Sequence, residues 1–176
     1  MRALLAIVAL GLSACGFHLA GTRPLPPALQ NVYIEVIAPY RVLQPPLEAA
    51  LRAGLQRRGA DVLSSRSAEA TVIRLSELTE TREVLSIGLD GKALEFRLVT
   101  SVHYEVIGGG KPLIEPGDLR LMRDYSFQPE QVLAKEAEEA RLREFIQTEM
   151  AQLILLRLEA RLGRLPAADA PLQPAS

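Results

Sequence analysis

The fold is decided by residues 94–106, LEFRLVTSVHYEV. Apolar and polar side chains alternate along this run, which is the pattern of a β-strand with one buried face and one solvated face. One parity holds Leu94, Phe96, Leu98, Val102, Tyr104 and Val106, and the other holds Glu95, Arg97, Ser101, His103 and Glu105. The run therefore predicts a long strand that is covered on one face only.

Further strands are expected on both sides of this run. Asp90-Gly91 is a strong turn signal before it, and three glycines at 108–110 end it. By their β-branched and apolar content, the other predicted strands are 32–37, 60–63 (a short strand or an approach to one), 70–78 with a continuation at 83–87 after a bend, and 119–127.

Two segments have helical periodicity. After Pro45-Pro46, leucines recur every four residues at 47, 51 and 55, which places them on one face of a helix. A second helix is predicted from residue 130 to about 162, with an apolar stripe of Leu142, Phe145, Ile146, Leu153, Ile154 and Leu156. The expected fold class is α+β: a two-layer sandwich with two helices packed on one face of a small mixed, largely antiparallel four-stranded sheet.

The N-terminus has the pattern of a lipoprotein signal peptide. Arg2 precedes an apolar run from Ala3 to Leu12, which is shorter than the roughly 20 residues that a spanning helix needs. Small residues then lead to Cys15, the only cysteine. We predict a signal peptide at 1–14 and lipidation of Cys15, and Gly16 in place of an aspartate favours the outer membrane. A lipidated tether at 15–31, one domain at 32–165 and a disordered tail at 166–176 are expected.

Composition argues against several classes of function. The chain has 20 Lys+Arg and 21 Asp+Glu, so no general attraction to nucleic acid is expected. With no Trp and 5% aromatic residues, an aromatic cleft for sugars is disfavoured. Neither a nucleophile elbow nor a phosphate-cradling loop is present, and His18 and His103 have no partners at metal-ligand spacing. We expect no enzyme activity, no catalytic residues, no cofactor and no metal.

Two stretches of the chain resemble a known family. The start Cys15-Gly16-Phe17-His18-Leu19, and the segment from Arg123-Asp124-Tyr125 through Leu133-Ala134-Lys135 into a long helix, resemble the lipopolysaccharide-assembly lipoproteins of the LptE family. The resemblance implies a plug-and-barrel complex with the outer-membrane β-barrel LptD. It also implies help in assembling that barrel and in inserting lipopolysaccharide into the outer leaflet.

The same resemblance implies lipopolysaccharide-binding lysines. Lys135 falls in the matching Leu-Ala-Lys stretch, and Lys92 lies in the predicted hairpin turn, where Leu89 occupies the position that is basic in some relatives. An ordinary solvated surface is the alternative for both lysines. The alternative function is a lipoprotein subunit of a phospholipid-type envelope transport system, which also combines a lipobox with a compact α/β domain.

Overall fold

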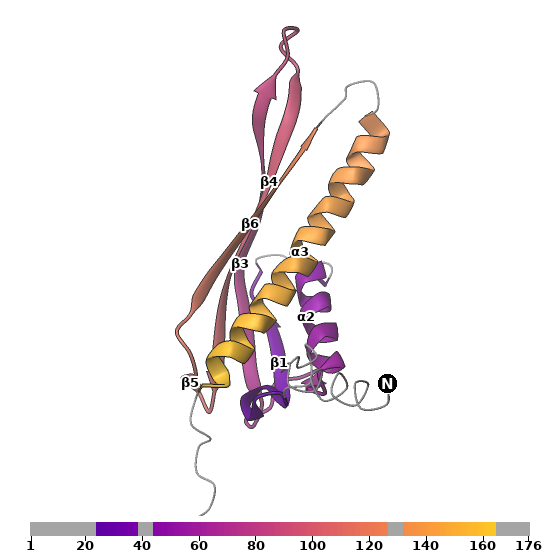
Figure 1. The fold of residues 1–176 in the computed structure, drawn as a ribbon. Helices are drawn as coiled ribbons and strands as arrows, with labels where there is room; N and C mark the ends of the chain where they lie inside the picture. The colour runs from indigo at the N-terminus through magenta and orange to yellow at the C-terminus, as the bar shows by residue number, and fades with distance from the viewer. Residues whose placement is uncertain (1–23, 39–43, 127–131, 165–176) are drawn as a thin grey trace, which may run out of the picture.

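A computed structural model describes residues 24–38, 44–126 and 132–164, with the side chains of 132–135 left out of the description. The predictions for Cys15, for the signal peptide and for residues 166–176 therefore concern residues outside the described ranges. Figure 1 shows two helices on one side of a twisted sheet, and a β-hairpin that extends beyond both. Among the described residues, no helix is both long and apolar enough to cross a membrane.

The described strands form one six-stranded mixed sheet in the order β2-β1-β3-β4-β5, with β6 also paired to β4. Pairing of β1 with β2 and β3 is parallel, and the pairs that involve β4 are antiparallel. The strands are β1 Asn31–Val36, β2 Asp61–Leu63, β3 Thr71–Ile87, β4 Ala93–Gly108, β5 Lys111–Pro112 and β6 Gly117–Ser126.

The predicted fold class is confirmed, but the predicted count of four strands is too low. Strand β2, which has three residues, lies in the segment 60–63 that was predicted as a short strand or an approach to one, and β5, which has two residues, was not predicted. A strand as short as β5 cannot show a repeated alternation, so sequence periodicity does not detect it.

Helix α2 (Pro46–Arg57) and helix α3 (Val132–Leu162) cover one face of the sheet, and a single 3₁₀ turn, η1, spans Pro27–Leu29. Pro46 occupies the first turn of α2, where its missing N–H costs nothing. The two helices approach closely at Gly54, because a Cβ there would lie 3.1 Å from Cδ2 of Leu155.

The core lies between the helices and the sheet. Leu47, Leu51 and Leu55 of α2 are all fully buried, as their spacing predicts. The buried residues of α3 are Ile146, Gln147, Met150, Ala151, Ile154, Leu155, Leu158 and Leu162. Leu29 is fully buried as well, so the packed part of the chain begins before residue 32.

Two members of the predicted stripe of α3 face solvent instead. Phe145 is 56% exposed and Leu156 is 58% exposed. At 100° per residue, Leu156 lies about 200° around the helix from Ile154, so both cannot face the sheet. The stripe was correct at Ile146 and Ile154 and wrong at Phe145 and Leu156.

Strands β3 and β4 extend beyond the strands on either side of them and form a projecting arm. The register shifts between Ser76 and Thr79, and Glu77 in this bulge has a positive φ of 53°. A bulge bends a strand and increases its twist. We call residues 79–100 the arm and the rest of the described domain the base. The expected bend between 78 and 83 lies a few residues too late, because the bulge is at Glu77 and the strand is paired without a shift from Thr79 to Val84.

Candidate functional site

The arm is joined to the first half of α3 by a cluster of charged and polar side chains. Its centre is Glu139, whose side chain is 16% exposed. The Glu139 carboxylate accepts hydrogen bonds from the Tyr125 hydroxyl, from Arg82 at 3.0 Å and from Arg143 at 2.6 and 3.1 Å. One carboxylate on the helix thus holds side chains from β3, β6 and its own helix.

This network continues to the other helix through Glu80. Arg143 lies 3.4 Å from one oxygen of Glu80, and the amide nitrogen of Gln147 donates to the other at 3.1 Å. The Gln147 carbonyl oxygen then accepts from the backbone N–H of Leu47 at 2.9 Å. That N–H belongs to the first turn of α2, where helical donors have no intrahelical partner. The arm, α3 and α2 are therefore joined by one hydrogen-bonded chain.

The pKa values in this cluster show which groups carry charge. Burial alone would raise the pKa of Glu139, but hydrogen bonds from Tyr125, Arg143 and Arg82 outweigh it, so the pKa falls below its ordinary value of 4.5. Burial and the bond to Glu139 raise the pKa of Tyr125. At neutral pH the carboxylate is therefore ionised and the phenol is protonated, which suits the hydrogen bond between them.

An aromatic pair lies beside this cluster, where β4 and β6 are paired. The rings of Phe96 and Tyr125 stack with centroids 5.6 Å apart, and the Arg82 guanidinium carbon lies 4.7 Å from the centre of the Phe96 ring. Contacts of a cation with a ring face are attractive. Arg82 is thus held by a carboxylate and a ring together.

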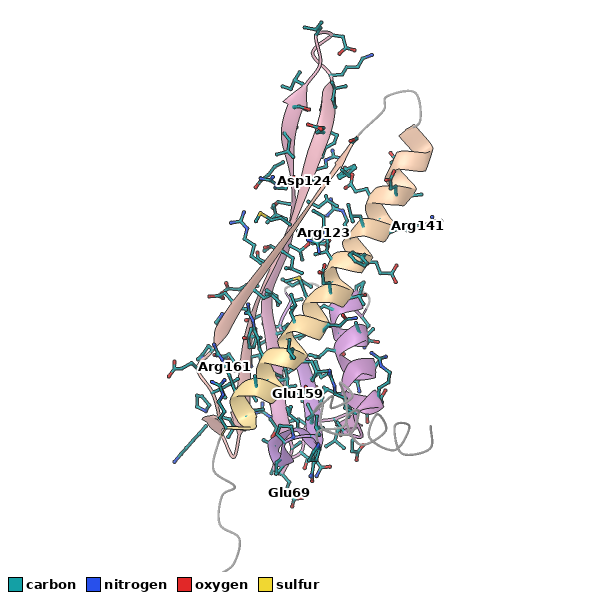
Figure 2. All side chains as sticks on the ribbon, viewed as in Figure 1. Glu69, Arg123, Asp124, Arg141, Glu159 and Arg161 are labelled. Atoms are coloured by element: carbon teal, nitrogen blue, oxygen red, sulfur yellow. The ribbon has the colours of Figure 1, made fainter. Side chains whose placement is uncertain are left out.

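The face of the sheet away from the helices is polar, and many of its charged side chains form ion pairs with side chains of neighbouring strands. Arg97 and Asp124 form a bidentate pair at 2.8 and 2.9 Å. Arg74 bridges Glu35 and Glu105 at 2.7 and 2.9 Å. Figure 2 shows Arg123 and Asp124 on β6 beside the arm, and Glu159 and Arg161 on α3 in the base.

His103 also lies on this open face. Its Nδ1 is 2.8 Å from Oδ1 of Asp118, and the hydrogen bond to Asp118 outweighs partial burial, so the pKa of His103 rises above 6.5. The His103 side chain is 28% exposed, and Asp118 is its partner on the neighbouring strand.

The tip of the arm combines exposed apolar side chains with one cation. Ile87 is 66% exposed and Leu89 is fully exposed, and Leu94 is also exposed. Lys92 Nζ lies 3.3 Å from Oδ2 of Asp90, with both side chains more than half exposed. An anion that binds Lys92 must therefore compete with Asp90.

Lys135 belongs to α3, but its side chain lies outside the described residues. The arm tip and the start of α3 point toward the same end of the molecule (Figure 1). In the sequence, Glu139 and Arg143 are recognisable as an i,i+4 pair on a helix, but Arg82, Tyr125, Glu80 and Gln147 are not recognisable as their partners. No local pattern reveals these partners, because they come from other elements.

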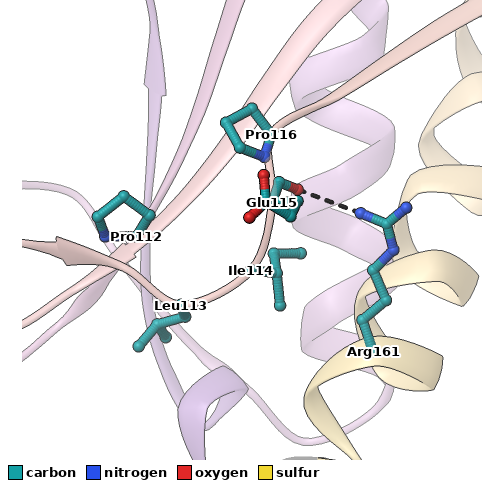
Figure 3. A pocket seen from close by; sticks show the side chains of 6 residues that line it. All are labelled: Pro112, Leu113, Ile114, Glu115, Pro116 and Arg161. Carbon is teal, nitrogen blue, oxygen red and sulfur yellow. Dashed lines mark hydrogen bonds between the residues drawn. The ribbon is translucent and has the colours of Figure 1, made fainter.

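A small pocket at the opposite end is formed by the β5–β6 loop and the end of α3. It is lined by Pro112, Leu113, Ile114, Glu115, Pro116 and Arg161 (Figure 3). Arg161 donates to the backbone carbonyl of Glu115 at 3.1 Å. This contact holds the loop on the helix, and we assign the pocket no function.

These features define an α+β domain with paired polar side chains on its open sheet face and exposed apolar side chains at the tip of its arm. Within the described ranges, no group of three or more His, Cys, Asp or Glu side chains is placed to hold a metal ion. The family model described as LptE, lipopolysaccharide-assembly, matches residues 29–158. The chain therefore belongs to the LptE family, which is non-enzymatic.

Individual relatives agree with this assignment. The chain is 33% identical to the LPS-assembly lipoprotein LptE of Photorhabdus laumondii, over 90% of this chain and 82% of the relative. It is 30% identical to the protein of that name from Pectobacterium atrosepticum, over 97% of each. The solution NMR structure of lipoprotein B from Nitrosomonas europaea is similar at a TM-score of 0.66 and 26% identity, over 85% of this chain and 94% of that one.

Proposed function

We propose that the chain is an outer-membrane lipoprotein that forms a plug-and-barrel complex with LptD. In this role it aids assembly of the barrel and insertion of lipopolysaccharide into the outer leaflet. Membership of the LptE family carries the proposal, since the relatives are named for lipopolysaccharide assembly. The phospholipid-transport alternative has no comparable observation in its favour.

The surface of the domain suits a polar enclosure. The interior of an outer-membrane barrel is polar, so a plug needs a hydrated surface without a large uncompensated charge. The open sheet face meets this requirement through its cross-strand pairs, Arg97 with Asp124 and His103 with Asp118. The base supplies the rigid core on which this face is built.

The proposed anchor is Cys15, freed by removal of the signal peptide at 1–14. Two or more acyl chains bind a membrane firmly, whereas one holds only marginally. An anchored chain remains near its partner at a high effective concentration, so moderate direct contacts are enough for a stable complex. We place the anchor at the periplasmic face of the outer membrane and the folded domain in the barrel lumen.

For lipopolysaccharide we propose two contacts, Lys92 and Lys135. A lysine offers a compact positive charge to a phosphate. Around Lys92, the exposed Ile87, Leu89 and Leu94 provide apolar contact for an amphiphilic ligand. Because Asp90 competes for Lys92, we expect Lys135 to contribute more to the binding of phosphate.

Depletion of the chain in its own organism tests the role. We expect a loss of assembled LptD barrel and a fall in surface lipopolysaccharide, both restored by the wild-type gene. Unchanged barrel assembly and unchanged surface lipopolysaccharide after full depletion would contradict the proposal. A variant with Cys15→Ser separates the contribution of the anchor from that of the folded domain.

A further inference from the structure

The sheet has two long open edges, and one of them is guarded by arginines. On the outer edge of β6, the Asp118 carbonyl accepts from Arg157 at 3.2 Å and the Met122 carbonyl accepts from Arg123 at 2.9 Å. An unpaired edge is a template for adding another strand, and proteins commonly block such edges. Here guanidinium groups occupy edge carbonyls that an added strand would use.

The other open edge is the side of β3 in the arm. Strand β1 pairs with β3 only as far as Leu75, and no described strand lies on this side of β3 beyond it. From Thr79 to Leu85 every residue is exposed. The arm therefore presents an uncovered strand edge on the side opposite to β6.

The register shows which backbone groups this edge offers. Backbone groups alternate between the two sides of a strand, and the Leu75 carbonyl points toward β1, since it accepts from Ile37 N–H at 2.8 Å. Its neighbours Arg74 and Ser76 therefore point toward β4, where they face Glu105 and His103.

The same alternation continues past the bulge. There the backbone N–H and C=O groups of Thr79, Thr81 and Glu83 point toward β4. Their partners on β4 are Ser101, Val99 and Arg97. The N–H and C=O groups of Glu80, Arg82 and Val84 are left facing the open edge. The guarded edge provides an independent check, because the alternation also places the Asp118 and Met122 carbonyls outward, where the arginines bind them.

The charged side chains of this strand do not block its edge. Glu80 and Arg82 are turned toward α3, where they bind Arg143 and Glu139. Glu83 lies on the open face, with Arg120 at 3.9 Å. The charges that would ordinarily discourage strand addition are thus engaged on the two faces of the sheet, away from its edge.

We infer that the β3 edge at residues 80–84 receives a short extended segment of the barrel partner by strand addition, an inference that rests on the proposed complex. Main-chain hydrogen bonds supply affinity in this mode, and alternate side chains supply specificity. The added segment runs between the tip and the base. Its side chains beside Glu80 and Arg82 are polar, and the one beside Val84 is apolar.

Amide hydrogen exchange on the isolated chain and on the purified complex tests the inference. The amides of Glu80, Arg82 and Val84 should exchange rapidly in the isolated chain and at least roughly tenfold more slowly in the complex. The amides of Arg120 and Asp124, which point outward on the guarded edge, serve as the internal control and should slow much less. Equal slowing at both edges would overturn the inference.

A matched pair of proline variants gives a second readout. Val84→Pro removes an outward N–H from the β3 edge, and Arg120→Pro removes one from the β6 edge; proline is tolerated at such positions. Both variants should fold, and only Val84→Pro should reduce the barrel recovered with the chain, by roughly tenfold. If Val84→Pro fails to fold, Val84→Lys replaces the apolar side chain beside the added segment with an unpaired charge and should reduce recovery as well.

The outcomes separate the two proposals. Full recovery of the barrel with folded Val84→Pro or Val84→Lys overturns strand addition and leaves the proposed function intact. A wild-type chain that binds no barrel refutes both. Concentration-dependent protection of the edge amides in the isolated chain would assign the edge to a second copy of this chain, and would likewise overturn the inference.

Discussion

The base and the arm of this domain are stabilised in different ways. In the base, α2 and the second half of α3 bury a continuous apolar core against the sheet. In the arm, this core ends at Phe96 and Leu98, the contact with α3 includes the charged network of Arg82, Glu139, Arg143 and Glu80, and the distal apolar side chains are left exposed. Apolar burial stabilises a fold without directionality, whereas a charged network fixes orientation. The base therefore carries most of the stability, and the charged network fixes the direction of the arm.

The largest expected effect comes from a cavity in the base. Ile154→Ala removes a fully buried side chain and should lower the free energy of unfolding by about 2–5 kcal/mol. Leu156→Ala on the same helix is the matched control, since Leu156 faces solvent, and should change stability by less than about 0.5 kcal/mol. Urea unfolding of both variants measures the difference, and equal losses would contradict the burial described here.

A smaller and more local effect is expected in the network. Glu139→Gln keeps the shape of the side chain but removes the charge shared by Arg82 and Arg143, and should cost about 1–3 kcal/mol. Faster amide exchange should appear in the first half of α3 before it appears around Ile154. Tyr125→Phe, which removes one of the same bonds, should have a weaker effect of the same kind.

The sign of the pH dependence follows from the same carboxylate. Because the folded pKa of Glu139 lies below its ordinary value of 4.5, its stabilisation is present above that value and is lost as pH falls through the folded pKa. In acid the wild type should therefore lose more stability than Glu139→Gln. Equal acid sensitivity of the two proteins would show that Glu139 is not the group that couples arm and helix to pH.

Binding of lipopolysaccharide should distinguish the end of the molecule that holds the arm tip and the start of α3 from the opposite end. Lys135→Asp should weaken binding about tenfold, which corresponds to about 1.4 kcal/mol. Lys92→Asp should weaken it less, because Asp90 already offsets that charge. Arg57→Asp at the end of α2 in the base is the control and should not change binding. Titration with purified lipopolysaccharide measures all three, and unchanged binding in both lysine variants would assign the lysines to ordinary surface.

The smallest effect is expected at the His103 and Asp118 pair. The raised pKa of His103 means that its contribution to stability is complete below pH 6.5 and is lost as pH rises through the folded pKa. NMR titration should show the pKa of His103 above 6.5, and Asp118→Asn should move it back toward that value. A pKa at or below 6.5 in the wild type would mean that the pair does not persist in solution.

The apolar core was more predictable than the charged network. The period-two run at 94–106 and the leucines of α2 are local patterns, and most of their apolar side chains are buried between the helices and the sheet. Leu94 has the parity of Phe96 but is exposed, since neither described helix covers that end of the arm. Periodicity shows which side chains share a face, but it does not show how far along the strand that face is covered.

The arm network was not predictable from one sequence. Glu139 and Arg143 were visible because they lie four residues apart on one helix. Arg82 lies 57 residues from Glu139 in sequence, and only the register of β3 with β4 and the tilt of α3 bring them together. The two lysines came from family resemblance and Cys15 from the signal-peptide pattern, and their roles stay predictions.

Purification of the chain from outer membranes tests the central claim most directly. A tagged, lipidated wild-type chain, extracted in mild detergent, should recover the LptD barrel in a one-to-one ratio, as measured by quantitative mass spectrometry. A chain that is folded and lipidated but is recovered without the barrel would contradict the account.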